Sequence, residues 1–393
     1  MSKLNQLYIT TWGYPTDKDK GNPFIKEMAE AIASRGVKVV VVNLTFRSVL
    51  YLFSKSEIHY QVSENVILKT IRCISFLPSF LMSKRIRNKM LSKQVLLQMN
   101  RIAEECGKPE AFQFHYILHA WGALFEPYLK EHQIPYVLFE HSPGGAFLKG
   151  IRKDFGGFIT QDMLYNFVRC AQLRIARIPK YQLKLNDLYG TQFSLLPSFV
   201  LNQWFTKNII SKSTDRFDLL AIGSLTRTKN YALLIDAMSR LSNTQQDIQL
   251  FIIGDGPKKQ ELYDQIDALG LSTVTLLGPC SKSEVFDKIR ESHAVVVSSK
   301  HETFGNTVIE AMSQGKPVVS TKCDGPQTII TESTGILCEQ NAEALAEAIE
   351  RLFLNYATYD QESIKAHCLK HYSENAVMDQ LSNLYEKHLG LAF

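Results

Sequence analysis

Residues 298–326 constrain the fold of this chain more than any other stretch. A β-branched run of the length that buried strands favour ends at Ser298, and after Gly305 the apolar residues recur with helical period. Gly315-Lys316-Pro317 ends the predicted helix, and residues 317–321 form the next β-branched run. The stretch therefore predicts a strand–loop–helix–strand unit of an α/β sheet.

The loop and the helix of this unit each carry a carboxylate. Glu310 follows Glu302 by eight residues, about two helical turns, so both can face one crevice if the helix begins near Phe304. The N–H groups of a first helical turn are unpaired and attract a diphosphate, and nearby carboxylates can accept hydrogen bonds from sugar hydroxyls. The pattern points to a nucleotide-sugar site. The alternative is that Glu302 caps the helix and Glu310 faces water.

The run E-T-F-G-N-T-V-I-E-A-M-S-Q-G-K-P-V-V-S-T, followed by G-P, closely resembles the donor-site signature of retaining glycosyltransferases with the GT-B fold. The match is nearest to family 4, the glycosyl transferases group 1 type. The resemblance implies an α/β protein of two facing Rossmann-like domains, with a C-terminal helix crossing back to the first. It implies that Glu302 positions the transferred sugar and that Glu310 binds the ribose. The residues whose backbone would bind the donor diphosphate are Thr303, Phe304, Gly305 and Asn306.

A second loop, residues 223–230, resembles the family's G-R-x-x-x-x-K, which clamps the donor diphosphate. Lys229 matches the lysine, a point charge suited to phosphate. Ser224 occupies the arginine position, and Arg227 is the candidate that replaces the missing cation. The alternative is that the side chains of Lys229 and Arg227 are exposed to solvent and do not bind phosphate.

His141 is the candidate catalytic residue of the first half of the chain. It directly follows a predicted strand, 134–140, and ligands bind outside the carboxyl ends of strands in open α/β sheets. Its position resembles that of a histidine which reaches the donor sugar near the reacting carbon; the alternative is a histidine that orders the loop. His115 and His119 are expected to be satisfied strand residues.

The loop 14–23 resembles the family's glycine-bearing loop near the substrates, with Gly21 and Asn22 as the acceptor or phosphate candidates. Asp17 and Asp19 in the same loop spell D-x-D, a metal motif of a different glycosyltransferase fold. We expect these aspartates to be solvated surface charges. No metal and no cofactor are predicted, because cations and a helix terminus can stabilise the departing diphosphate.

At 393 residues the chain is long for one core, so two domains are expected. We expect an acceptor-binding Rossmann-like domain in residues 1–205, a nucleotide-sugar-binding Rossmann-like domain in 206–370, and a tail in 371–393 that returns to the first domain. A polar linker, 207–216, and a new series of strand and helix patterns from 217 onward set the main boundary.

The composition favours a cytoplasmic protein, acting at the inner face of a membrane if its acceptor is lipid-linked. The sequence shows neither a signal-peptide pattern nor about 18 consecutive apolar residues, and the seven cysteines lack CxxC spacing. Residues 76–93 mix bulky apolar residues with five cations. Such a segment can lie on an anionic membrane, or it can be a helix that packs on its own domain.

These features predict a retaining glycosyltransferase that moves a hexose-type sugar from a nucleotide-diphosphate sugar, with a UDP-sugar expected, to a hydroxyl of a glycan or lipid-linked acceptor. Such an enzyme would serve cell-surface polysaccharide synthesis, in lipopolysaccharide or capsule. Closure of the two domains would exclude water and bring the substrates together. Two alternatives stay open: a nucleotide-sugar 2-epimerase of the same fold, and a non-catalytic partner subunit that binds the nucleotide-sugar. Nucleic acid is not an expected partner.

Overall fold

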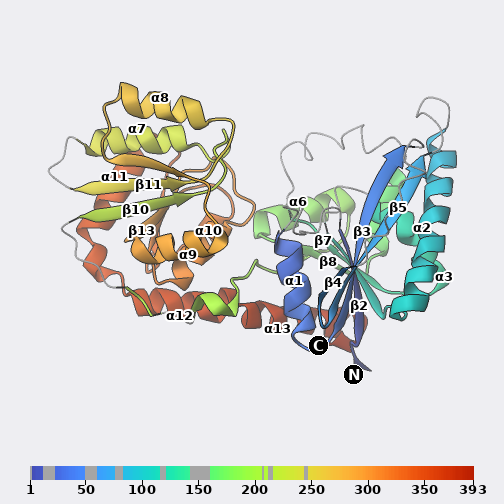
Figure 1. The fold of residues 1–393 in the computed structure, drawn as a ribbon. Helices are drawn as coiled ribbons and strands as arrows, with labels where there is room; N and C mark the ends of the chain where they lie inside the picture. The colour runs from blue at the N-terminus through green and yellow to red at the C-terminus, as the bar shows by residue number, and fades with distance from the viewer. Residues whose placement is uncertain are drawn as a thin grey trace. The chain divides into compact units, whose positions relative to one another are not determined.

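The computed structural model describes residues 2–11, 23–48, 60–75, 83–115, 121–141, 160–205, 208–210, 216–242 and 247–393. The chain divides into two compact units: Met1–Leu196 with Met378–Phe393, and Pro197–Val377. Each unit is an α/β layer structure in which helices flank a largely parallel sheet (Figure 1). Gly21, Asn22, His119 and the D-x-D aspartates lie outside the described residues.

The described part of the second unit contains a six-stranded parallel sheet in the order β12–β11–β10–β13–β14–β15. Counted from its first strand this is the doubly wound order 3-2-1-4-5-6, which reverses direction between β10 and β13. The β-branched runs predicted from the sequence form the central strands β13 and β14, which are buried throughout. The strands are β10 (Phe217–Ile222), β11 (Ile248–Ile253), β12 (Val274–Gly278), β13 (Ala294–Val297), β14 (Val318–Thr321) and β15 (Gly335–Cys338).

Helices cover both faces of this sheet (Figure 1). One face packs on α7 (Tyr231–Leu241), α8 (Lys259–Ala268) and α11 (Ala342–Leu354). The other carries α9 (Lys282–Glu291) and α10 (Asn306–Ser313), and α12 (Gln361–Tyr372) packs on α10. Three short 3₁₀ turns complete the unit: η5 (Asn202–Phe205), η6 (Pro326–Thr328) and η7 (Tyr356–Thr358).

The described part of the first unit contains an eight-stranded sheet in the order β4–β5–β3–β2–β6–β7–β8–β9, parallel except for β4 against β5. A separate short pair joins β1 (Ser2–Lys3) to β16 (Leu391–Ala392). The strands of the large sheet are β2 (Gln6–Thr11), β3 (Lys38–Ser48), β4 (Tyr60–Ser63), β5 (Val66–Ser75), β6 (Ala111–His115), β7 (Tyr136–Phe139), β8 (Leu173–Ala176) and β9 (Ser194–Leu195).

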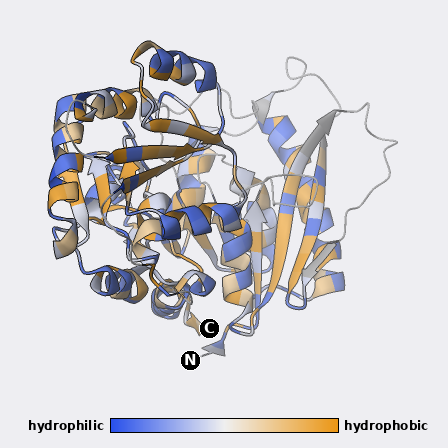
Figure 2. Ribbon diagram, turned by 60° about the vertical axis from the view of Figure 1, so that its left-hand side comes forward, coloured by the Kyte–Doolittle hydropathy of each residue, from blue (hydrophilic) through white to orange (hydrophobic). Residues whose placement is uncertain are grey.

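Helices also cover the sheet of the first unit. Figure 1 shows α2 and α3 on one side of this sheet and α1 on the other. The helical elements are α1 (Pro23–Ala33), α2 (Lys84–Cys106), η4 (Trp121–Phe125), α3 (Glu126–Glu131), α5 (Gln161–Cys170) and α6 (Pro179–Tyr189); α13 (Glu374–Leu389) contributes its residues from Met378 onward. Figure 2 shows hydrophobic residues concentrated on the strands, whereas the helices alternate between hydrophobic and hydrophilic faces.

The second half of the basic segment 76–93 belongs to helix α2. One stripe of this helix, from Leu91 through Val95 and Met99 to Ile102, is buried in the core of the first unit. Arg87 is also buried, whereas Ile86 is exposed. From Lys84 onward the segment therefore follows the second of the two interpretations, a helix that packs on its own domain; residues 76–82 lie outside the described residues.

The unit boundaries differ from the predicted boundaries at 205 and 370. Residues 197–205 belong to the second unit, because Val200 forms a bridge with Ser373 and the side-chain amide of Gln314 donates to the carbonyl of Trp204. The returning tail begins at Met378 rather than at residue 371. The sequence did not reveal these contacts because each joins segments more than a hundred residues apart.

None of the described helices is long and apolar enough to cross a membrane. No three His, Cys, Asp or Glu side chains of the described residues gather in a way that could hold a metal ion.

Candidate active site

Two loops of the second unit carry the predicted donor-site residues, and both follow central strands. Residues 223–230 follow β10 and residues 298–305 follow β13, the two strands between which the strand order reverses. Ligands of doubly wound sheets bind at the carboxyl ends of strands on either side of such a reversal. The topology therefore brings Lys229 and Glu302 together although 73 residues separate them in sequence.

The loop after β10 is fixed by close backbone packing against a glycine turn. A Cβ at Gly254 would lie 1.9 Å from the carbonyl oxygen of Gly223, and one at Gly256 would lie 2.6 Å from that of Leu225. The N–H of Gly223 donates to the carbonyl of Ile253, and that of Leu225 to the carbonyl of Asp255, both at 3.0 Å. Only glycine permits these approaches, and they hold the loop in place before any ligand binds.

The loop after β13 rests on the turn that follows β14. The N–H of Glu302 donates to the carbonyl of Cys323 at 3.2 Å, and the N–H of Gly325 donates to the carbonyl of Glu302 at 3.1 Å. The hydroxyl of Thr321 donates to the carbonyl of Ser299 at 2.7 Å. These bonds fix both the start of the loop and the residue that carries the carboxylate.

Helix α10 begins at Asn306, directly after Gly305, where the helical period of the sequence begins. Gly305 precedes it with φ 100°, a left-handed conformation that ends the loop and turns the chain into the helix. Glu310 stands about one turn inside α10 and is half-buried. No hydrogen bond joins the backbone N–H groups of residues 303–306 to another residue that the structure describes.

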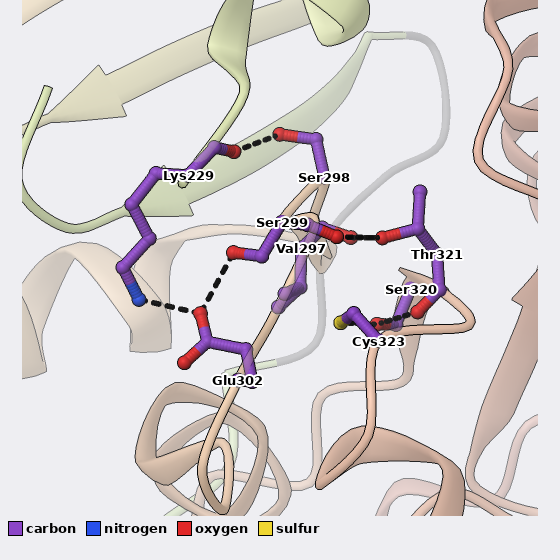
Figure 3. Close-up of polar contacts among 8 residues, drawn as sticks. All are labelled: Lys229, Val297, Ser298, Ser299, Glu302, Ser320, Thr321 and Cys323. Atoms are coloured by element: carbon purple, nitrogen blue, oxygen red, sulfur yellow. Dashed lines mark hydrogen bonds and ion pairs between the residues drawn. The ribbon is translucent and has the colours of Figure 1, made fainter. Parts of the chain in front are cut away.

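Lys229 and Glu302 form an ion pair with each other (Figure 3). The ammonium nitrogen of Lys229 lies 2.5 Å from Oε1 of Glu302, and the hydroxyl of Ser299 donates to the same oxygen at 2.7 Å. The second carboxylate oxygen, Oε2, makes no hydrogen bond to a described residue. The Lys229 and Glu302 side chains are 24% and 14% exposed, so the pair is partly open to solvent. Sequence analysis missed Ser299, because a serine after a strand carries no signal of its own.

Further bonds join the two loops. The hydroxyl of Ser298 donates to the carbonyl of Lys229 at 2.9 Å, and the N–H of Lys300 donates to the carbonyl of Thr228 at 2.8 Å (Figure 3 shows the first). Burial, together with the negative charge of Glu302, raises the pKa of the Tyr231 phenol. The site is thus a rigid frame that holds one cation, one carboxylate and a row of N–H groups.

The remaining candidates of the second unit differ in exposure. Arg227 and Ser224 are exposed, and no ion pair joins Arg227 to a residue that the structure describes. Thr303 is half-buried and Asn306 exposed. The ring of Phe304 is 5% exposed and packs edge-on against Tyr372, so only the backbone of this residue can face a ligand.

His141 belongs to the first unit and stands at the carboxyl end of β7. Its Nε2 lies 2.7 Å from Nδ1 of His115, and its Nδ1 lies 3.2 Å from Nη2 of Arg177. Burial and then the positive charge of Arg177 lower the pKa of both histidines well below the usual range. His115 is the last residue of β6, and both of its ring nitrogens have hydrogen-bond partners, as expected. Sequence analysis overlooked Arg177, although it directly follows β8 in the same way that His141 follows β7.

Comparisons with known proteins agree with this architecture. Residues 202–367 match the family described as "Glycosyl transferases group 1". The lipopolysaccharide core biosynthesis glycosyltransferase LpsD of Rhizobium meliloti is 29% identical over 44% of this chain and 50% of its own length. The chain spans about half the length of the curated relatives it matches.

Two solved structures match almost the whole chain. Sucrose-phosphate synthase from Thermosynechococcus elongatus superposes with a TM-score of 0.75 at 18% identity, covering 98% of this chain and 99% of that one. HepE from Anabaena in complex with UDP superposes with a TM-score of 0.71 at 16% identity, covering 98% and 100%. The fold is GT-B. The two parallel-sheet units and the return of the C-terminal residues to the first unit confirm the predicted GT-B architecture.

Proposed function

We propose that the chain is a retaining glycosyltransferase that moves a sugar from a UDP-sugar to a hydroxyl of a cell-surface glycan or lipid-linked acceptor. The observation that carries this proposal is the Lys229–Glu302 pair at the reversal of the GT-B sheet, beside the N–H groups of residues 303–306, which donate to no residue that the structure describes. Two of the similar proteins support the details: LpsD is named for lipopolysaccharide core biosynthesis, and HepE was solved with UDP.

The ion pair suggests how the donor binds. Glu302 neutralises the ammonium of Lys229. A diphosphate carries more negative charge than one carboxylate, so we expect it to draw Lys229 away from Oε1 of Glu302. Ser299 would continue to hold that oxygen, and both carboxylate oxygens could then accept hydrogen bonds from hydroxyls of the transferred sugar.

The same residues would stabilise the departing diphosphate. Its charge grows as the bond to the sugar breaks, and preorganised donors stabilise such charge most effectively. Lys229, the exposed Arg227 and the N–H groups of residues 303–306 supply those donors in our proposal. A metal ion is not required by this arrangement. The role of His141 toward the donor sugar stays a prediction.

A thermal-shift screen of nucleotide-sugars tests the proposal. A donor present at about 100 times its Kd stabilises the folded state by about 2.7 kcal/mol. For a unit of this size that raises Tm by about 5–10 °C. We expect a UDP-sugar to give the largest shift. Incubation with that donor alone should give no epimer; formation of an epimer would favour the 2-epimerase, and no shift with any donor would contradict the proposal.

Replacing Glu310 with glutamine tests the ribose role. A carboxylate that accepts two hydroxyls contributes about 1.5–3 kcal/mol, and the amide keeps the shape while weakening those bonds. We expect UDP affinity to fall by about 10-fold or more in calorimetry. Glu347→Gln, on the exposed surface of α11, is the matched control. Equal affinity of the two variants for UDP would discard the ribose role.

Replacing Ser299 with alanine tests whether the Ser299 hydroxyl orients the carboxylate of Glu302. The hydroxyl donates to Oε1 at 2.7 Å, and its loss leaves Glu302 oriented by Lys229 alone. In our proposal Lys229 moves to the donor diphosphate, so in this variant neither Lys229 nor residue 299 would hold the Glu302 carboxylate once the donor is bound. We expect kcat to fall by about 10-fold, the value of one hydrogen bond to a charged group, with UDP affinity nearly unchanged. A variant with wild-type kcat would show that Ser299 does not position Glu302.

A further inference from the structure

A chain of polar side chains runs through the first unit from the C-terminal helix to the ends of the central strands. The Tyr385 hydroxyl lies 2.8 Å from Oε1 of Gln113, and Nε2 of Gln113 lies 2.7 Å from Nε2 of His115. His115 Nδ1 contacts His141 Nε2 at 2.7 Å, and His141 Nδ1 faces Nη2 and Nε of Arg177 at 3.2 and 3.4 Å. Five residues from four parts of the sequence thus form one line.

Four of the five residues are buried, and His141 is half-buried. Gln113 and Tyr385 are 0% exposed, and His115 and Arg177 are 6% and 5% exposed. The His115 ring stacks on His141 and on Phe139, with centroids 4.9 and 4.8 Å apart. Water therefore has little access, and each donor along the line has to face an acceptor.

Arg177 fixes the direction of the line because a guanidinium can only donate. Nδ1 of His141 must therefore accept, so the ring proton of this neutral imidazole resides on Nε2. That N–H donates to Nδ1 of His115, which places the proton of His115 on its own Nε2. His115 Nε2–H then needs an acceptor, and the carbonyl oxygen of the Gln113 amide supplies it after a half-turn that exchanges the amide oxygen and nitrogen.

The opposite direction costs more. If the NH₂ of Gln113 donated to His115, the protons would pass along the line until Nδ1–H of His141 pointed at the Arg177 guanidinium. Two buried donors, one of them a cation, would then face each other. A single unsatisfied buried donor costs about 1–3 kcal/mol, and a charged one costs more. In the direction set by Arg177, the only donor of these five residues that needs a different acceptor is the Tyr385 hydroxyl, whose hydrogen can rotate.

We propose that Gln113, His115 and Arg177 are positioning residues that hold His141 as a neutral Nε2–H imidazole with both ring nitrogens engaged. The inference deepens the proposed function and rests on it for one consequence: the His141 side chain does not act as a general acid or base in the transfer. The lowered pKa of both histidines, caused by burial and Arg177, agrees with this assignment.

Long-range ¹H–¹⁵N correlation spectra of the full chain, labelled with ¹⁵N-histidine, test the proposal without any donor. The signals of His115 and His141 are assigned by their loss in His115→Asn and His141→Asn. We expect both rings to show the pattern of the neutral Nε2–H tautomer. An Nδ1–H tautomer or an imidazolium at either position would overturn the proposal.

Two variants at opposite ends of the line test its direction. Arg177→Met removes the donor at Nδ1 of His141, and we expect the single tautomer to be lost; Arg177→Lys keeps a donor and should keep the tautomer. Tyr385→Phe removes the far end and should leave the tautomer of His141 unchanged. A tautomer switch in Tyr385→Phe, with none in Arg177→Met, would show that the line runs the other way.

His132 provides an internal control in every spectrum. Its Nε2 bonds Oδ1 of Asn100 at 3.0 Å, apart from the line, so its signals should stay constant in all variants. A change in His132 together with His141 would report general unfolding rather than the loss of one contact. The spectra also separate the two proposals. If both histidines show the expected tautomers but no nucleotide-sugar binds, the glycosyltransferase assignment is rejected and the proposed hydrogen-bond direction stands.

Discussion

Lys229→Met should lower kcat/KM for the nucleotide-sugar by about 10²–10³, the usual effect of removing one preorganised donor from a developing negative charge. The ammonium is held by Glu302 at 2.5 Å, which places it at the reversal of the sheet, where the proposed donor site lies. Steady-state kinetics with the best donor of the thermal-shift screen provide the measurement.

The stability of the Lys229→Met variant should change little. A partly exposed ion pair contributes up to about 1 kcal/mol, and Glu302 keeps the hydroxyl of Ser299 as a partner. Lys288→Met is the matched control, because Lys288 pairs with Glu291 at 2.9 Å on the surface of α9 and lies outside the donor loops. If both variants kept wild-type kcat/KM, Lys229 would have no role in phosphate binding.

Gly325→Ala should displace the loop that carries Glu302. A Cβ at this position would lie 2.0 Å from the carbonyl oxygen and 2.3 Å from the carbonyl carbon of Phe304, both backbone atoms that cannot rotate away. Overpacking of this kind costs about 1–3 kcal/mol, and a shift of about 1 Å at a reacting site can cost 10²-fold in rate. We therefore expect a lower midpoint in urea unfolding together with a large loss of activity.

Gly270→Ala is the control that distinguishes displacement of the loop carrying Glu302 from a general loss of stability. Gly270 has φ 62° with nothing within 4 Å of a Cβ, so alanine there costs about 1–2 kcal/mol of backbone strain without touching the donor loops. We expect it to lower the midpoint while leaving kcat/KM unchanged. If Gly325→Ala behaved in the same way, the turn after β14 would not position Glu302.

Local pattern was sufficient to predict most of the second unit. Strands β10 (217–222) and β11 (248–253) belong to the series of strand patterns expected from residue 217 onward, because each is a mostly apolar run bounded by polar or glycine residues. The helical period after Gly305 predicted α10, whereas the left-handed conformation of Gly305 itself was not predicted. The contact of Ser299 with Glu302 depends on side-chain orientation, which no periodicity encodes.

The first unit was harder to predict. A helix that packs on its own domain was only one of two interpretations of residues 76–93, because this part of α2 combines apolar residues with several cations, one of which, Arg87, is itself buried. The line from Tyr385 to Arg177 joins residues up to 272 positions apart in one bond, so its existence follows from the strand order and not from spacing. His141 was located correctly at a strand end, yet its partners could be found only from the assembled sheet.

The split of the first unit between the two ends of the chain affects the order of folding during synthesis. Domains usually fold as they leave the ribosome, the N-terminal one first. Here Leu381 and Tyr385, both 0% exposed, belong to the core that begins with β2, and β1 has no partner until Leu391 and Ala392 are made. Residues 197–377 can close their sheet earlier. The unit that contains residues 2–196 is therefore completed only after residues 378–393 are made, and loss of residues 378–393 would damage that unit.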